Sequence, residues 1–97
     1  MIFEIRTYDL KPRSVPEFEE RTGAMIETRL RYSELGGFWS TEVGALNQVV
    51  HIWPYQDLNQ RAEIRGKAIS DGIWPPDNKA FLLNMESEIY LPAPFSP

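Results

Sequence analysis

Two short runs of alternating side chains, residues 37–43 and residues 46–53, constrain the fold of this chain more than any other feature. Alternation of this kind has the period of a β-strand. The runs are separated by Gly44 and Ala45, and a two-residue loop that begins with Gly is typical of a type II′ turn. The segment therefore predicts an antiparallel hairpin.

The register of this hairpin decides which side chains share a face, because a slip of one residue moves every side chain to the other face. A longer, bulged turn would change the pairs. With the two-residue turn, three cross-strand pairs share one face of the hairpin: Phe38 with His51, Ser40 with Val49, and Glu42 with Asn47. The opposite face then carries Trp39, Thr41, Gln48, Val50 and Ile52.

Helices are predicted on both sides of the hairpin. The first begins at Ser14, whose hydroxyl can cap free N–H groups while Glu17 returns the bond three residues later. The second begins at Asp57, with Gln60 in the same return position, and ends before Gly72, a residue typical of the position after a helix. Each segment carries apolar side chains at spacings of three and four residues, which indicates one apolar stripe per helix.

Strands are predicted at both ends of the chain. Residues 2–10 alternate between an apolar face and a mixed face, and residues 85–91 alternate in the same way. The order strand, helix, strand, strand, helix, strand is that of a ferredoxin-like α+β domain. We therefore predict a single domain over residues 1–97, with a four-stranded antiparallel sheet and both helices on one face.

Such a domain leaves the second face of its sheet bare. Both faces of the predicted hairpin carry large aromatic side chains, and a bare apolar surface marks an interface. A second copy of the chain is the predicted cover, so we expect a homodimer that forms through the sheet face.

Composition excludes several classes of protein. The sequence has 10 Lys and Arg against 14 Asp and Glu, for a net charge of −4, so nucleic-acid binding is not expected. There are no cysteines, which removes disulfides and thiolate chemistry. No apolar run approaches the roughly 20 residues that span a bilayer, and charges interrupt the N-terminus where a signal peptide needs apolar residues. We predict a cytoplasmic protein without a membrane span.

Three segments carry a family resemblance: EIRTYDLKP at residues 4–12, GFWSTEVGALNQVVHIW at residues 37–53, and LPAPFSP at residues 91–97. Together they resemble the NIPSNAP family, over almost the whole chain. The resemblance implies the dimeric α/β-barrel superfamily, in which two ferredoxin-like subunits join through their sheets. Relatives in that superfamily include cofactor-independent monooxygenases of aromatic polyketides, haem-binding enzymes and stress-response proteins, while bacterial NIPSNAP-like domains are mostly uncharacterised.

His51 is the only histidine and the candidate catalytic residue. It could serve as a general base, because its ordinary pKa lies near neutrality, or as a haem ligand. The alternative is a structural histidine that is hydrogen-bonded to a neighbour such as Ser40 or Tyr8. A lone histidine without cysteines or a carboxylate cluster is weak evidence for a metal, and no Gly-rich phosphate loop is present, so no cofactor is predicted.

Six further residues are candidates for ligand binding: Arg6, Tyr8, Trp39, Glu42, Asn47 and Trp53. The guanidinium of Arg6 could hold an anion, and Tyr8 could stack on an aromatic ring. The remaining four have structural alternatives, since polar pairs bond across hairpins and strand tryptophans anchor cores or interfaces. On the second helix, Arg61 and Arg65 lie one turn apart, but nearby acids favour an exposed, ion-paired face there.

These observations favour a small dimeric NIPSNAP-like domain that binds a small molecule or a protein partner. The alternative is a cofactor-independent monooxygenase or isomerase with a pocket between sheet and helices. That enzyme would use His51 as base and Arg6, Tyr8, Glu42 and Asn47 to orient the substrate.

Overall fold

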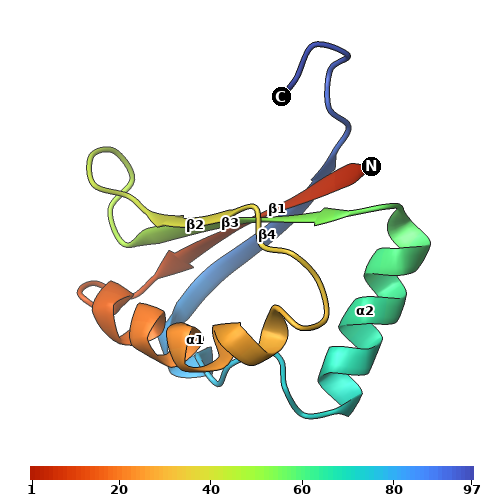
Figure 1. The fold of residues 1–97 in the computed structure, drawn as a ribbon. Helices are drawn as coiled ribbons and strands as arrows, with labels where there is room; N and C mark the ends of the chain where they lie inside the picture. Colours follow the sequence, from red (N-terminus) through yellow and green to blue (C-terminus); the bar gives the residue numbers. More distant parts are fainter.

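A computed structural model describes residues 1–97, and its elements follow the predicted order (Figure 1). They are strands β1 (Ile2–Leu10), β2 (Gly37–Ser40), β3 (Gln48–Tyr55) and β4 (Leu82–Tyr90), helices α1 (Val15–Arg29) and α2 (Leu58–Ser70), and the short 3₁₀ helix η1 (Lys79–Phe81). The strands form one four-stranded sheet in the order β2-β3-β1-β4, and all neighbours are antiparallel. The predicted ferredoxin-like α+β fold is confirmed.

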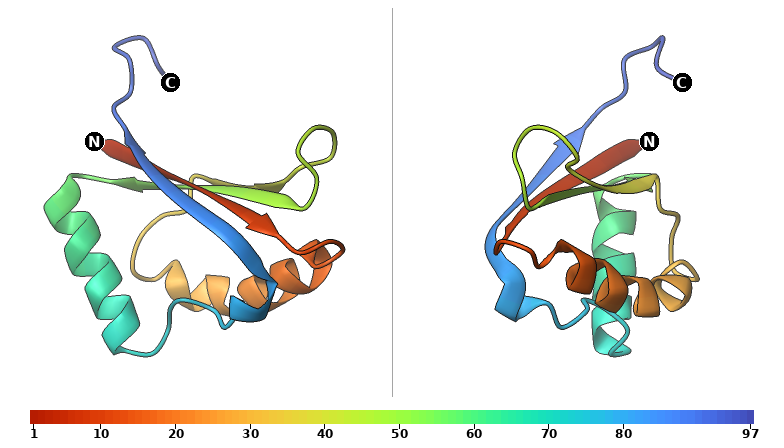
Figure 2. Two further views of the ribbon diagram at one scale, coloured as in Figure 1. Left: turned by 180° about the vertical axis from the view of Figure 1, so that it is seen from behind. Right: turned by 90° about the vertical axis from the view of Figure 1, so that its left-hand side faces the viewer.

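Both helices lie on the same side of the sheet, which we call the covered face, and no element packs on the opposite, open face (Figure 2). Two segments rise on the open side: the loop of residues 41–47 and the C-terminal residues 91–97 (Figure 1). The chain thus has two layers, and one surface of its sheet is bare.

The hairpin has the predicted register but not the predicted turn. Phe38 pairs with His51 and Ser40 with Val49, as expected. The strands end at residues 40 and 48, however, and residues 41–47 form a loop in place of a two-residue turn. The reason lies at Asn47, which adopts a φ of 58°. Its side-chain oxygen accepts a hydrogen bond from the N–H of Arg13 at 3.1 Å, which ties it to the connection between β1 and α1.

Local capping signals were correct for α2 and wrong for α1. The Asp57 carboxylate accepts a hydrogen bond from the N–H of Gln60 at 2.7 Å, and Gly72 follows the helix with a φ of 71°. Ser14 precedes α1 as predicted, but its hydroxyl donates to the carbonyl of Lys11 at 2.6 Å and makes no cap bond. The Ser14 hydroxyl therefore stabilises the tight turn after β1 and does not cap α1, as the sequence had predicted it would.

Proline does not end β3, although residue 53 was the predicted boundary. Pro54 pairs with Phe3 of β1 inside the strand. The β2–β3 pairing stops at Ile52, so no strand lies beside Pro54 on that side of β3. The N–H that proline lacks is therefore not required for a hydrogen bond of the sheet.

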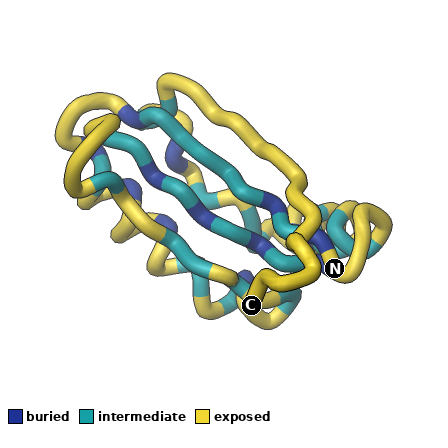
Figure 3. The backbone as a smooth tube through the Cα atoms, turned by 90° about the horizontal axis from the view of Figure 1, so that it is seen from above, coloured by how far each residue is buried: buried dark blue, intermediate teal, exposed yellow.

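The covered face carries the mixed set of β1 side chains. Residues alternate between buried and partly exposed along β3 and at the start of β1, whereas β4 is exposed along most of its length (Figure 3). Two small apolar clusters are buried: Ile2, Trp53 and Tyr55 in one, and Leu10, Phe18 and Val49 in the other. Between them, Glu4 and His51 are buried in the middle of the sheet. The core thus has a polar centre, and the candidate site adjoins it.

Candidate functional site

A cavity of about 490 Å³ lies between the covered face and the helices. Side chains from β1, β3, α1, α2 and the segment after α2 line it; they include Arg6, Tyr8, His51, Phe18, Arg65 and Trp74. A volume of this size is typical of small-molecule sites, which span roughly 300–1,000 Å³.

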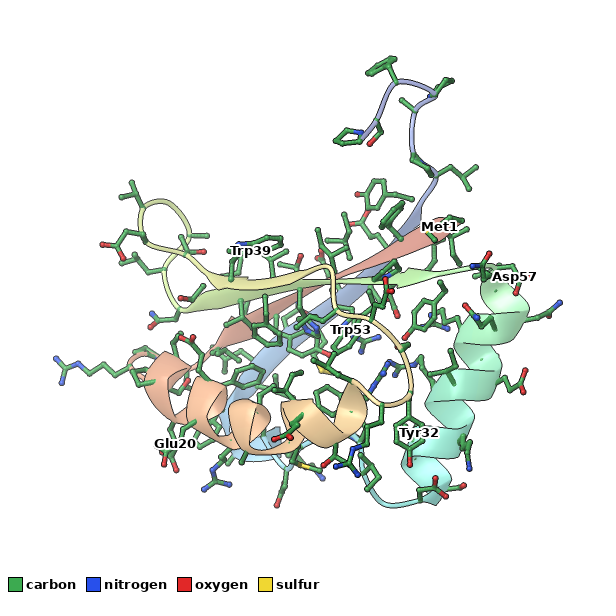
Figure 4. All side chains as sticks on the ribbon, viewed as in Figure 1. Met1, Glu20, Tyr32, Trp39, Trp53 and Asp57 are labelled. Atoms are coloured by element: carbon green, nitrogen blue, oxygen red, sulfur yellow. The ribbon has the colours of Figure 1, made fainter.

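Three of the seven residues singled out from the sequence line this cavity: Arg6, Tyr8 and His51. The other four do not, and they separate into two groups. Trp53 is buried behind His51, while Trp39 is 54% exposed and stands on the open side of the sheet (Figure 4). Glu42 and Asn47 belong to the loop at the end of the hairpin.

His51 is held by aromatic neighbours on β1, β2 and β3. Phe38 stacks on its ring with centroids 4.5 Å apart, and Tyr8 meets it edge-on at 4.9 Å. The indole N–H of Trp53 donates to Nδ1 at 2.7 Å. The sequence suggested Ser40 or Tyr8 as the hydrogen-bond partner of His51, but in the structure the partner is Trp53.

This hydrogen bond determines the tautomer of His51. An indole nitrogen can only donate, so Nδ1 must accept, and the neutral ring carries its proton on Nε2. Burial, assisted by the positive charge of Arg6, lowers the pKa of His51 to about 3, and the ring is neutral near pH 7. Nε2 is buried without a hydrogen-bond partner. The site therefore presents one unsatisfied N–H donor.

The same geometry bears on two predicted roles of His51. A general base or a haem ligand needs a free lone pair on the nitrogen that meets the substrate or the iron. The lone pair of Nδ1 is taken by Trp53, and Nε2 carries the proton. His51 is consequently not arranged to ligate a haem iron, and it is arranged to donate a hydrogen bond.

Glu4 organises the polar centre next to the cavity. Its Oε2 accepts from Arg6 at 2.9 Å and from Arg61 at 2.7 Å, and the hydroxyl of Ser87 donates to the same oxygen. Burial alone would raise the pKa of Glu4, but hydrogen bonds from Arg61 and Ser87 and the charge of Arg6 outweigh it and lower the pKa to about 2. Glu4 is therefore a structural carboxylate that holds two arginines in place.

Arg65 differs from these arginines because it makes no ion pair and no side-chain hydrogen bond, although it lines the cavity. Burial, followed by repulsion from Arg6, lowers its pKa. The sequence pattern predicted that nearby acids would neutralise this helix face. Asp57 is occupied as the cap of α2, and Glu63 makes no ion pair. Only the packing of α2 against the sheet places Arg65 at the cavity.

Asn78 is a second residue that the sequence did not single out. It is buried in the segment after α2 and lines the cavity. Its amide donates to the hydroxyl of Thr22 on α1 at 3.1 Å, and its Oδ1 has no partner. Because the segment has no regular structure, its position depends on tertiary contacts that no local pattern signals.

Fold and cavity together define the class of protein: a ferredoxin-like α+β domain with a lined cavity between its sheet and its helices. The family follows from the sequence comparison. The NIPSNAP family model matches residues 3–97, and the chain belongs to the NIPSNAP family. The resemblance noted above is thereby confirmed.

Relatives with curated names are longer than this chain. Human Protein NipSnap homolog 3B is 39% identical over 99 residues, which cover 97% of this chain and 40% of that protein. Protein NipSnap homolog from Dictyostelium discoideum is 32% identical over 94 residues, which cover 94% of this chain and 42% of that protein. The chain thus spans about two fifths of the length of these relatives.

Solved structures match over the full length of the chain. A NIPSNAP family protein with unknown function from Agrobacterium tumefaciens has a TM-score of 0.92 and 35% identity, covering 100% of this chain and 92% of that one. An uncharacterized NIPSNAP domain protein from Burkholderia xenovorans has a TM-score of 0.89 and 33% identity, with coverage of 100% and 99%. A putative antibiotic biosynthesis monooxygenase from Nitrosomonas europaea, at 13% identity and a TM-score of 0.73 with coverage of 99% and 93%, shows a shared fold alone.

No helix combines the length and the apolar character that crossing a membrane requires. No group of three or more histidine, aspartate or glutamate side chains converges in a way that could hold a metal ion. The assignment to the cytoplasm stays a prediction.

Proposed function

We propose that the chain forms a homodimer through the open faces of two sheets, and that each subunit binds a small molecule in the cavity between sheet and helices. The observation that carries the proposal is the cavity itself. It is lined by aromatic side chains, yet it contains a buried histidine N–H without a partner and an arginine without an anion.

Unpaired polar groups of this kind favour a ligand. A buried donor or acceptor without a partner costs about 1–3 kcal/mol in folding free energy. His51 Nε2 and Asn78 Oδ1 are both buried and unpartnered in the cavity. A small molecule with a matching acceptor and donor would satisfy both groups.

The dimer proposal rests on the open face. Trp39 on β2 and Tyr90 on β4 are 54% and 46% exposed there, and Phe3, Ile5 and Ile52 lie between them with partial exposure. The exposed Glu86 and Glu88 of β4 border these apolar residues on the same face. An uncovered apolar surface with a polar rim is typical of an interface between subunits. The dimeric superfamily to which the family resemblance points supports the same assembly.

Catalysis by a cofactor-independent monooxygenase or isomerase has less support. Such a reaction needs a group in the cavity that takes a proton from the substrate. Neutral His51 has no free lone pair there, because Trp53 occupies Nδ1. Glu4 is committed to Arg6, Arg61 and Ser87. Asp77, the one carboxylate in the lining, is exposed to solvent. We therefore favour binding over chemistry.

Native mass spectrometry of the purified protein tests the assembly and shows any retained molecule. We expect the mass of two chains, and a clean monomer would contradict the dimer. The cavity is tested separately by fluorescence titration with N-phenyl-1-naphthylamine, a neutral aromatic probe.

Two variants of α2 show where the probe binds. Ile69 lines the cavity and is 52% exposed, so Ile69→Trp should obstruct the cavity without disturbing the core. Leu58 is 58% exposed on the same helix and does not line the cavity, so Leu58→Trp is the matched control. We expect Ile69→Trp alone to weaken binding of the probe. Equal binding by both variants, or no binding by the unmodified protein, would overturn the proposed site.

A further inference from the structure

The charges around the cavity are unbalanced. Its lining contains three positive side chains, Arg6, Arg65 and Lys79, against one negative side chain, Asp77. Glu4, behind the lining, is shared by Arg6 and Arg61 through a single oxygen. The surplus of positive charge is local, because the chain as a whole carries a net charge of −4.

Two cations of the lining, Arg65 and Lys79, make no ion pair, and Arg65 is the less exposed of the two. Arg6 and Arg61 both contact Glu4, at 2.9 and 2.7 Å, whereas Arg65 makes no ion pair. It is only partly exposed, so water compensates its charge incompletely. Burial and the neighbouring Arg6 lower its pKa, which means that the charged guanidinium is less stable here than it would be in water. An anion beside the guanidinium would reverse this effect, and its fork of N–H groups matches an oxyanion.

His51 offers a second donor on the same wall. Only 2% of the residue is exposed, and its Nε2–H has no partner although the ring lines the cavity. Since Nδ1 accepts from Trp53, Nε2 can only donate. A donor of this kind selects a ligand oxygen that accepts, such as an oxygen of an anion or a carbonyl.

The rest of the wall is apolar and aromatic. Phe18 lies on α1, Phe38 on β2 and Trp74 in the segment after α2, and Leu82 and Ile69 extend the apolar lining. Aromatic walls favour flat apolar groups, which stack or meet them edge-on.

We propose that the ligand is an anion attached to a flat apolar body, with Arg65 binding the anionic end, His51 Nε2 donating to an oxygen, and the aromatic wall enclosing the body. This inference rests on the proposed function, because it names the class of ligand for the same cavity. Carboxylates, sulfonates and phosphates share the required chemistry.

Two fluorescent probes that differ in one charged group test this ligand class. N-phenyl-1-naphthylamine is neutral, and 8-anilinonaphthalene-1-sulfonate has the same aromatic skeleton with a sulfonate. Each is titrated into the unmodified protein and into Arg65→Gln, Arg65→Lys and Arg31→Gln. Arg31 is exposed and does not line the cavity, so Arg31→Gln is the matched control for the loss of one positive charge.

We expect Arg65→Gln to weaken binding of the sulfonate about tenfold or more, as the loss of a charge-assisted contact does, and to change binding of the neutral probe little. Arg65→Lys, which keeps the charge, should restore most of the sulfonate affinity, and Arg31→Gln should leave both probes unchanged. Equal effects of Arg65→Gln on the two probes, or no effect on either, would overturn the inference while cavity binding of the neutral probe left the proposed function intact. If Ile69→Trp does not weaken binding of the neutral probe, the site itself is wrong and the inference fails with it.

Discussion

The pH dependence of folding stability gives a direct test of the environment assigned to His51. Burial, followed by the charge of Arg6, lowers its pKa from 6.5 to about 3; Arg65 acts in the same direction and Glu4 opposes both. The unfolded chain then binds a proton at His51 under conditions where the folded chain does not. The free energy of unfolding must therefore fall as the pH drops from about 6.5 toward 3.

The size of the effect follows from these values. Full protonation of one site in the unfolded state alone changes stability by about 1.4 kcal/mol per pH unit. Integrated from pH 7 to pH 5 with an unfolded pKa of 6.5, His51 contributes a loss of about 2 kcal/mol. Protonation of Glu4 also destabilises the folded protein in acid. Folding lowers the pKa of Glu4 from 4.5 to about 2, so this loss of folding stability lies mainly below pH 4.5. The interval from pH 5 to pH 7 isolates the histidine.

The comparison variant is His51→Asn, which cannot titrate and keeps an acceptor for the indole N–H of Trp53. Urea unfolding of both proteins is measured at pH 5, 6 and 7 at one fixed protein concentration, because the stability of a dimer depends on concentration. The free energy of unfolding of the unmodified protein should decrease by about 2 kcal/mol more than that of the variant between pH 7 and pH 5. Parallel losses in the two proteins would refute the reasoning, since His51 would then titrate alike in both states.

Three other predictions concern the open face, the helix caps and the polar centre. Trp39→Ala should weaken the dimer by about 2 kcal/mol in sedimentation experiments, as loss of a central aromatic anchor does, and unchanged dissociation would contradict that interface. Asp57→Ala should lower the free energy of unfolding by about 1 kcal/mol, and Ser14→Ala by less because Ser14 makes no cap bond; equal losses in urea unfolding would speak against this. Glu4→Gln should cost about 3 kcal/mol by removing the buried carboxylate from the partly buried Arg6 and Arg61, against less than about 1 for Glu17→Gln in an exposed pair, and similar midpoints would count against the network.

Most features that depend on neighbours along the chain could be predicted correctly from the sequence, and the cap bond of Ser14 is the exception. The alternation in residues 2–10 and 37–53 predicted strands, and the spacing in the helical segments predicted α1 and α2. The Asp57 cap and the glycine at residue 72 were also correct, because each acts within one turn of its own helix.

Features that depend on distant contacts could not be read in this way. The predicted two-residue turn was wrong because the side chain of Asn47 accepts a hydrogen bond from the N–H of Arg13, 34 residues earlier. This contact competes with the two-residue turn. In the site, Arg6 and Tyr8 could be singled out because strand alternation places them on one face, and His51 because it is the only histidine. Arg65 could not, because its role depends on where α2 packs and on which acids are already engaged elsewhere.

The sequence by itself determined that β1 has two different faces, and the tertiary structure alone decided which one the helices cover. The more apolar set, with Phe3 and Ile5, lies on the open face, while Glu4 and Arg6 lie beneath the helices. A buried carboxylate is stable only with hydrogen-bonding partners. Those partners, Arg61 and Ser87, come from 57 and 83 residues further along the chain. Short-range periodicity is written into neighbouring residues, whereas the compensation of a buried charge exists only once the distant elements have assembled around it.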